Sequence, residues 1–257
     1  MDKSNYITMI DRGMEIIDVL YQQEEAMGIS EISKKLNIPK ATVFRILNTY
    51  EKWGMVQRVG ENGDFVLGLN FVKYGERAKN NYSWYSLGET LAEKLSLEVG
   101  ETVNIGKLHE DSVLILYSKE GESSLLVSRL FPVSALYCSA MGKIFLTEFK
   151  ESELKAYFED REHPKRTVYT ITNFSAFQKE KEEIKEKGIA YDREEYEYGL
   201  TCLAQGIHNG QGKLIGAMSI SGPTTRMEFK GFDQLEEKLK KAVNETEKVL
   251  KYYQDSP

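Results

Sequence analysis

The chain has 257 residues, of which 41% are hydrophobic and 29% charged, with a formal net charge of −6 and only 2 cysteines. These values exclude an intrinsically disordered chain, a collagen-like repeat and a disulfide-stabilised scaffold. No apolar run approaches the roughly 18 residues of a membrane span, and the first residues lack the pattern of a secretory signal. We therefore expect a cytoplasmic globular protein that does not enter the membrane, with a length that fits two domains.

The first part of the chain has the periodicity of three helices followed by a hairpin. The predicted elements are helices over 8–23, 30–36 and 40–53 and strands over 55–59 and 65–67. Ser30 is a good N-cap for the second helix, and a tight turn over residues 37–39 separates it from the third. Residues 61–64 have the chemistry of a hairpin turn. This order of elements predicts a winged helix-turn-helix over residues 1–68.

The local charge of this part suits nucleic acid, although the whole chain is acidic. Residues 1–75 hold nine Lys and Arg against ten Asp and Glu, a net of −1, which leaves −5 for the rest of the chain. Within residues 28–58, six basic residues face two acidic ones, so the local net charge is +4. Because a local basic patch is what attracts phosphate, the acidic total does not argue against DNA as a partner.

The second helix of a helix-turn-helix lies in the major groove, so residues 40–53 form the predicted recognition helix. Thr42 and Arg45 stand three apart near its start, where side chains reach base edges, and arginine is the commonest reader of guanine. The lysines nearby are assigned to phosphates, and the wing tip, with Arg58 at its base, is expected to reach an adjacent minor groove or phosphate. The residues predicted to contact DNA are Lys34, Lys35, Lys40, Ala41, Thr42, Arg45, Asn48, Arg58 and Asn62.

The second part of the chain mixes helical and strand patterns. A helical pattern over 69–80 predicts a linker helix, which leaves residues 81–257 as a second domain. Its predicted helices cover 87–97, 140–148, 151–158, 174–187 and 232–252. Its predicted strands cover 102–108, 113–119, 125–130, 189–195, 202–208 and 213–221. The fold class is therefore α+β, and the sheet of the C-terminal α/β domain is expected to be rich in antiparallel pairs.

The segment GIAYDREEYEYGLTCLAQGIHN, residues 188–209, resembles the signature of the IclR family of bacterial transcriptional regulators. The positions that fill the signature without a gap are Gly188, Asp192, Glu195, Cys202, Leu203, Ala204, Ile207, His208 and Asn209. Further similarity lies in residues 39–47, 66–68, 100–103, 140–143 and 219–223. The resemblance therefore extends from about residue 5 to about residue 250.

The resemblance implies an architecture and a function. The architecture is an N-terminal winged helix-turn-helix that binds operator DNA, a linker helix, and a C-terminal GAF-like domain, assembled as a homodimer or tetramer. The function is transcriptional regulation, with operator binding controlled by a small-molecule effector, an organic or sugar acid, in the C-terminal domain. No cofactor, metal or catalytic residue is expected.

Position by position, the resemblance also implies an effector site. Its residues are Ser139, Ala140, Met141, Asp192, Cys202, Ser219 and Ser221. Their chemistry is compatible with an acid, because the start of a helix near Ala140 offers free N–H groups to a carboxylate. Ser219 and Ser221 stand two apart on a predicted strand and so point to the same face. Asp192 would accept a hydrogen bond from a ligand hydroxyl, or bind a protonated or metal-bridged group.

Two other chemistries are open for these residues. Cys202 could act as a nucleophile with His208 or Tyr137, which would make the chain a small cytosolic Cys-dependent hydrolase with an N-terminal interaction module. Against this, His208 lies six residues farther along the same predicted strand, roughly 20 Å away at about 3.3 Å per residue. Asp192, Cys202 and His208 could instead gather around a metal ion, although their spacing is not that of a metal site. The regulator is the favoured hypothesis.

Overall fold

The computed structural model describes residues 7–121 and 133–251. The chain divides into two units, residues 1–79 and 80–257, and each has its own hydrophobic core. The predicted strand over 125–130 lies outside the described residues. None of the helices within the described ranges is both long and apolar enough to span a membrane.

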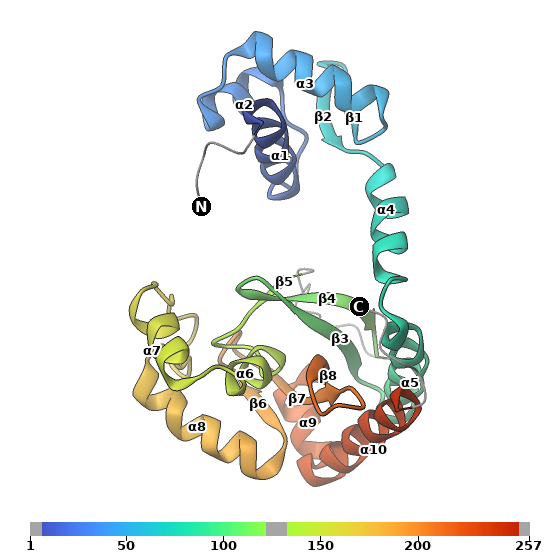
Figure 1. Cartoon of the computed structure of the whole chain (residues 1–257), viewed down its shortest axis with the longest axis vertical. Helices are drawn as coiled ribbons and strands as arrows, with labels where there is room; N and C mark the ends of the chain where they lie inside the picture. The colour runs from blue at the N-terminus through green and yellow to red at the C-terminus, as the bar shows by residue number, and fades with distance from the viewer. Residues whose placement is uncertain (1–6, 122–132, 252–257) are drawn as a thin grey trace. The chain divides into compact units, whose positions relative to one another are not determined.

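The N-terminal unit consists of helices and one hairpin, in the order that the sequence predicts (Figure 1). Its elements are α1 (Thr8–Tyr21), α2 (Ile29–Leu36), α3 (Lys40–Lys52), β1 (Val56–Val59), β2 (Asp64–Leu67) and α4 (Asn70–Lys79). The apolar stripes of the first three helices pack together with Phe65 of the hairpin. The core residues are Ile16, Ile17, Leu20, Ile32, Ile38, Val43, Ile46, Leu47, Val56 and Phe65. The predicted helix-turn-helix with a hairpin wing is confirmed.

The turn between α2 and α3 depends on one left-handed residue. Asn37 has φ 54° and ψ 40°, a conformation that asparagine tolerates better than most residues. The Ser33 hydroxyl donates a 2.6 Å hydrogen bond to the Ile38 carbonyl, and the Ile38 N–H donates to the Ser33 carbonyl at 3.1 Å. The Ile38 side chain is buried in the core. These contacts hold α3 at a fixed angle to α2.

The start of α2 differs from the prediction. Its N-cap is Gly28, and Ser30 lies exposed inside the first turn. The Gly28 N–H donates a 2.9 Å hydrogen bond to the Glu31 carboxylate. An acidic side chain in the first turn therefore caps this helix, where the helix dipole favours negative charge.

Two glycines permit close backbone contacts in the N-terminal unit. A Cβ at Gly68, just after β2, would overlap the carbonyl oxygen of Gly54, just after α3. A Cβ at Gly13 in α1 would overlap the hydroxyl of Tyr50 in α3. Glycine at these positions thus lets the hairpin and α1 approach α3 closely.

The C-terminal unit is built on one six-stranded sheet, with strand order β5-β4-β3-β8-β7-β6. The strands are β3 (Thr102–His109), β4 (Ser112–Lys119), β5 (Val133–Ala135), β6 (Ala190–Arg193), β7 (Leu200–His208) and β8 (Leu214–Pro223). All neighbouring strands pair antiparallel, which confirms the predicted antiparallel-rich sheet and the α+β class. The short strand β5 was not predicted.

Six helices accompany the sheet in the described part of the unit. They are α5 (Ser83–Val99), α6 (Ala140–Thr147), α7 (Glu151–Glu159), α8 (Phe174–Lys187), α9 (Thr224–Lys230) and α10 (Phe232–Leu250). Helix α5 begins earlier than predicted, and its first turn buries Trp84 and Tyr85. Helix α9 was not predicted, because it is short and follows β8 without a loop. Gly231, with φ 80°, separates it from α10.

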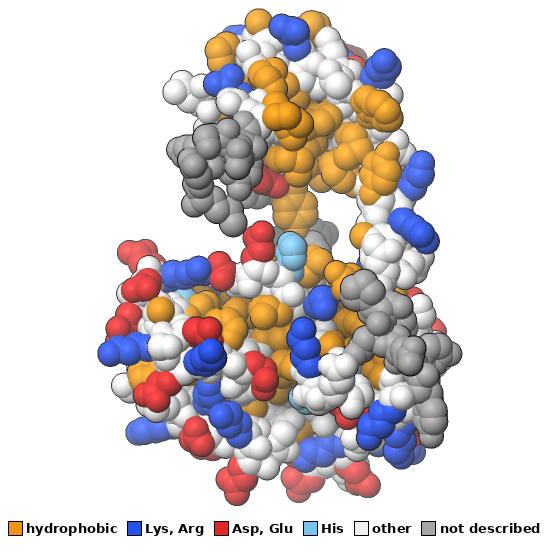
Figure 2. Space-filling view, viewed as in Figure 1, with side chains coloured by type: hydrophobic (Ala, Val, Ile, Leu, Met, Phe, Trp, Pro, Cys, Tyr) orange, Lys and Arg blue, Asp and Glu red, His pale blue; other side chains and the backbone are white. Residues whose placement is uncertain are grey.

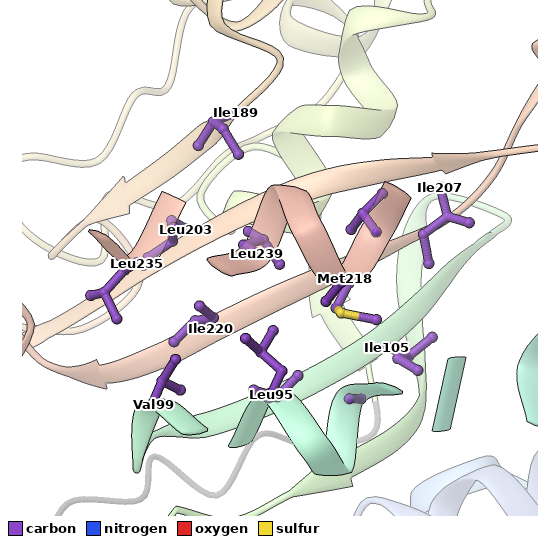
Figure 3. Packing of buried hydrophobic residues seen from close by; sticks show 14 of the residues in the cluster. Leu95, Val99, Ile105, Ile189, Leu203, Ile207, Met218, Ile220, Leu235 and Leu239 are labelled. Carbon is purple, nitrogen blue, oxygen red and sulfur yellow. The ribbon is translucent and has the colours of Figure 1, made fainter. Parts of the chain in front are cut away.

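Helices cover both faces of the sheet (Figure 1). On one face, Leu95 and Val99 of α5 and Leu235 and Leu239 of α10 pack against apolar strand residues (Figure 3). Those strand residues include Ile105, Leu203, Ile207, Met218 and Ile220. Side chains alternate along a strand, so the residues between them point to the opposite face, which α6, α7 and α8 cover. That second face carries the candidate site.

Candidate functional site

Helix α3 presents a mixed polar and apolar surface to solvent at its first two turns. Its buried side chains are Val43, Ile46 and Leu47. Its exposed side chains there are Lys40, Ala41, Phe44 and Arg45, and Thr42 and Asn48 are half-buried. Because these positions follow the α2–α3 turn directly, they stand where a recognition helix reaches base edges. Arg45 takes part in no ion pair among the described residues, so its guanidinium is available to a base.

The other predicted DNA contacts lie on the neighbouring elements. Lys34 and Lys35 are exposed in the last turn of α2. Asn62 is exposed at the tip of the wing, beside Gly63, whose φ is 69°. These side chains can reach phosphates without rearrangement of the fold.

Arg58 at the base of the wing is engaged within the chain. Its Nε lies 3.0 Å from both carboxylate oxygens of Glu51, and its Nη2 donates to the Asn48 side-chain oxygen at 2.7 Å. The guanidinium also lies over the Phe65 ring, with 4.5 Å between Cζ and the ring centroid. Arg58 and Asn48, both predicted to contact DNA, thus bind each other and join the wing to α3. No local pattern indicates this pairing, because the two residues are ten positions apart on different elements.

A row of polar side chains crosses the face of the sheet that α6 covers. Asp192 on β6 pairs with Cys202 on β7, and Cys202 pairs with Ser221 on β8. Two residues before Ser221 on β8, Ser219 pairs with Asn104 on β3. Residues directly opposite each other in an antiparallel sheet share a face, so these five side chains lie together.

The start of α6 borders the same space. Ser139 is the N-cap, and its hydroxyl accepts a 3.1 Å hydrogen bond from the Gly142 N–H and donates one of 2.6 Å to the Ala135 carbonyl. The N–H groups of Ala140 and Met141 have no acceptor within the helix. With the positive end of the helix dipole, they form a site that suits an anion.

These residues surround one pocket. Its lining is Asn104, Ser134, Ser139, Ala140, Met141, Asp192, Tyr196, Leu200, Cys202, Ser219 and Ser221. Every residue predicted for the effector site is in this set. The cavity itself is only about 20 Å³, room for about one water molecule, so a larger ligand requires the lining residues to move apart.

The sequence prediction missed four lining residues, of which Asn104 is the most informative. The Asn104 side-chain nitrogen lies 3.4 Å from the Ser219 hydroxyl and 3.3 Å from that of Ser221. Its oxygen is buried and has no hydrogen-bond partner among the described residues. One signal was available, because Asn104 is a polar residue between Val103 and Ile105 in a strand that is otherwise apolar at its centre.

Burial makes Asp192 a weak acid. Desolvation raises the pKa of its carboxyl to about 7, and the nearby charge of Glu195 acts in the same direction. The N–H groups of Glu195 and Tyr196 donate to its Oδ1 at 2.8 Å and 3.2 Å and oppose the rise. Near neutral pH, Asp192 therefore exchanges between a charged acceptor and a neutral donor.

Lys143 of α6 places a positive charge near the buried carboxyls of Asp192 and Glu195. Its side chain is fully buried, and its ammonium group is bonded to the Glu195 carboxylate. It also donates to Glu180 of α8 at 3.0 Å and to the Tyr191 carbonyl of β6 at 2.7 Å. Because its donors are used in this way, Lys143 holds α6, α8 and β6 together and is not free to bind a ligand.

The enzymatic alternative finds no support in this geometry. Burial, and then the Asp192 charge, raises the pKa of the Cys202 thiol well above its ordinary value, whereas a nucleophilic cysteine needs a lowered one. The His208 ring lies 2.9 Å from the Glu247 carboxylate, and the Tyr137 hydroxyl donates to the Pro164 carbonyl. Neither proposed helper is thus directed to Cys202. Throughout the described ranges there is no group of three or more His, Cys, Asp or Glu that could hold a metal.

Comparison with known proteins identifies relatives of both units. The profile described as "IclR helix-turn-helix domain" matches residues 9–60, and that described as "Bacterial transcriptional regulator IclR C-terminal" matches residues 86–247. The Escherichia coli (strain K12) protein named DNA-binding transcriptional repressor YiaJ is 30% identical over 243 residues. These are 93% of this chain and 85% of that protein.

Solved structures share the same fold. The crystal structure of the Thermotoga maritima IclR has a TM-score of 0.75 at 28% identity and covers 96% of this chain and 100% of its own. An IclR homologue from Microbacterium hydrocarbonoxydans, complexed with 4-hydroxybenzoate, has a TM-score of 0.83 at 18% identity. It covers 95% of this chain and 100% of its own, and at this identity it shows the fold alone.

Asp192→Asn should stabilise the chain at neutral pH more than at acidic pH. The pKa is about 7 in the folded state and about 3.9 in an unfolded chain. The native carboxyl therefore costs stability that grows as the pH rises from about 4 to about 7 and is constant above. Asparagine still accepts both N–H bonds but does not ionise. We expect a gain of about 1–3 kcal/mol near pH 8 that shrinks toward pH 5, measured by urea unfolding.

Asp160→Asn is the matched control, because Asp160 is exposed just after α7. It should change the unfolding free energy little at either pH. An Asp192→Asn gain of equal size at both pH values would contradict the raised pKa.

Proposed function

Because this chain belongs to the IclR family of bacterial transcriptional regulators, we propose that its polar pocket binds a small organic or sugar acid that controls operator binding. The chain is a DNA-binding transcriptional regulator with an effector-binding domain, and not an enzyme. The observation that carries the proposal is the convergence of all predicted effector residues on one pocket. We assign DNA binding to residues 1–68, the link to 69–80 and effector binding to 81–257.

The chemistry of the pocket favours an acid that also carries a hydroxyl group. The free N–H groups of Ala140 and Met141 and the hydroxyl of Ser221 can donate to a carboxylate. Asp192 is partly protonated at neutral pH, because its pKa is about 7, so its repulsion of an anion is reduced. The unpartnered oxygen of Asn104 lacks a donor, which a ligand hydroxyl would supply.

The surface of the N-terminal unit supports DNA reading by α3. Arg45 and Ala41 are exposed on its first two turns, and Lys34 and Lys35 precede them on α2. The local net charge of +4 over residues 28–58 attracts the phosphate backbone. We assign base reading to Arg45 and Thr42, and phosphate binding to the lysines.

An apolar stripe on α1 supports a homodimer. Hydrophobic side chains gather on one face of the N-terminal unit in Figure 2. Along α1, the exposed residues Ile7, Ile10, Met14 and Tyr21 follow each other at spacings of three, four and seven, which places them on one face of the helix. A second copy of the chain is the partner that we assign to this stripe, because a helix-turn-helix dimer reads two half-sites.

Control of DNA binding by an effector requires a part of the protein that can adopt two arrangements. Helix α4 is anchored to the N-terminal unit at its start, where Phe71 packs against the core and Asn70 donates to the Trp53 carbonyl, and none of its residues is fully buried in the described chain. An effector that favours one arrangement of the dimer would change the spacing of two α3 helices and thereby shift the operator-binding population. We favour repression as the mode of regulation, since the relative YiaJ is named a repressor. We propose the cytoplasm as the location.

Arg45→Ala should lower affinity for selected DNA sites by about 1–3 kcal/mol, roughly 5- to 150-fold, and relax the base preference at one position. Sites are first selected from a random DNA pool with the wild-type chain, and binding is then measured by fluorescence anisotropy. Arg77→Ala removes the same charge from the exposed surface of α4 and should leave base preference unchanged. Unchanged binding by Arg45→Ala would show that α3 does not read bases.

Ile10→Glu should weaken the dimer, because it places a charge in a stripe that association would bury. Sedimentation equilibrium should report a dissociation constant raised at least tenfold. Thr8→Glu is the control, since Thr8 is exposed on α1 but lies away from the stripe. Equal dimerisation by all three chains would place the dimer contact elsewhere.

A small acid should raise the melting temperature of the full chain by several degrees at about 100 times its dissociation constant. The panel contains 4-hydroxybenzoate, short hydroxy acids, sugar acids and the amide of each. Ser221→Ala should reduce the shift, whereas Ser118→Ala, at an exposed position of the same sheet, should not. Shifts by amides and not by acids, or by no member of the panel, would remove the acid as the effector class.

A further inference from the structure

Phe44 is an exposed aromatic residue on the recognition helix. Its side chain is 46% exposed, although the adjacent Val43 is fully buried. The hydrophobic core of the N-terminal unit includes Val43, Ile46 and Leu47 of α3 but not Phe44. Among the described residues, no ring contact or cation–π contact of Phe44 is present either. Packing within the unit therefore does not explain a large apolar side chain at this position.

The neighbours of Phe44 are the residues assigned to DNA. On an α-helix, side chains three and four positions apart lie side by side, so Phe44 adjoins Ala41 and Asn48. Arg45 follows it directly and is exposed beside it. A helical side chain also leans toward the helix N-terminus, which directs the ring toward Ala41. Ala41 and Phe44 thus form one apolar spot on an otherwise polar surface, next to the arginine assigned to base reading.

The major groove offers one apolar group to such a spot. Each base pair presents donors and acceptors there, and only thymine adds a methyl group, at C5. Alanine and phenylalanine side chains are suited to contact that methyl. We propose that Phe44, together with Ala41, packs on a thymine methyl beside the base pair that Arg45 reads. This assignment rests on the proposed reading of DNA by α3.

The surroundings favour DNA over a protein partner for this spot. Lys40 and Arg45 are exposed near it on α3, and the local net charge over residues 28–58 is +4, which suits a polyanion. The α1 stripe assigned to the dimer reaches α3 at a pocket lined by Ile10 and Arg45, and neither Phe44 nor Ala41 lines that pocket. Phe44 therefore supplies specificity for one base, while the lysines supply affinity without sequence preference.

The test uses the full chain and a site selected from a random DNA pool. Each thymine of a half-site is replaced in turn by deoxyuridine, which removes only the methyl group. With the wild-type chain, one replacement should weaken binding about three- to fivefold, the value expected for one buried methyl group. With Phe44→Ala, that same replacement should have no effect, and Phe44→Leu should retain part of it.

Trp53→Ala is the matched control. Trp53 is an exposed aromatic residue at the opposite end of α3, and its loss should leave the deoxyuridine sensitivity unchanged. Circular dichroism and sedimentation confirm that each variant is folded and dimerises as the wild type does. The partly active Phe44→Leu chain keeps the test valid if Phe44→Ala is poorly folded.

The possible results separate this inference from the proposed function. If the wild-type chain enriches no sequence from the pool, the proposed function fails. If it enriches a site in which no thymine methyl contributes to binding, the role of Phe44 fails and the function stands. Sensitivity to deoxyuridine that persists in both Phe44 variants would overturn the role as well.

Discussion

One buried lysine holds together the elements that border the candidate effector site. The ammonium group of Lys143 is removed from water and bonded to Glu195, Glu180 and the carbonyl of Tyr191. Taking these charges out of water costs several kcal/mol, so the arrangement is stable only while every bond is made. That condition holds the start of α6 against β6. The first residues of α6 therefore line the same pocket as Asp192, whose carboxyl is also buried.

In the N-terminal unit, a charged side chain also holds two elements together. Arg58 binds Glu51 and Asn48 and lies on the Phe65 ring, so its charge is used to fix the wing against α3. Arg45 has no such partner among the described residues and remains available to a ligand. The two arginines thus have different roles: Arg58 holds the wing against α3, and Arg45 faces solvent.

Local patterns in the sequence predicted most helices and strands, because periodicity reports which face of an element is buried. They failed where distant residues meet. Asn104 joins the pocket only because β3 pairs with β8, which brings it to Ser219, 115 positions away. The capping of α2 by Glu31 instead of Ser30 depended on where the chain enters the helix. The residues predicted for the effector site came from the resemblance to a family, which covers positions far apart in the chain, and not from periodicity.

The pairing of β6, β7 and β8 also fixes a length. Asp192 and Ser221 both pair with Cys202, so their backbones are two strand spacings apart, about 9.5 Å. Backbone hydrogen bonds set this span, and no side-chain substitution alters it. Exchanges along the row can therefore change which functional groups a ligand must carry, while the distance between those groups on the ligand stays nearly constant. The strand spacing therefore sets the distance between the groups that bind a ligand, and the side chains of the row determine their chemistry.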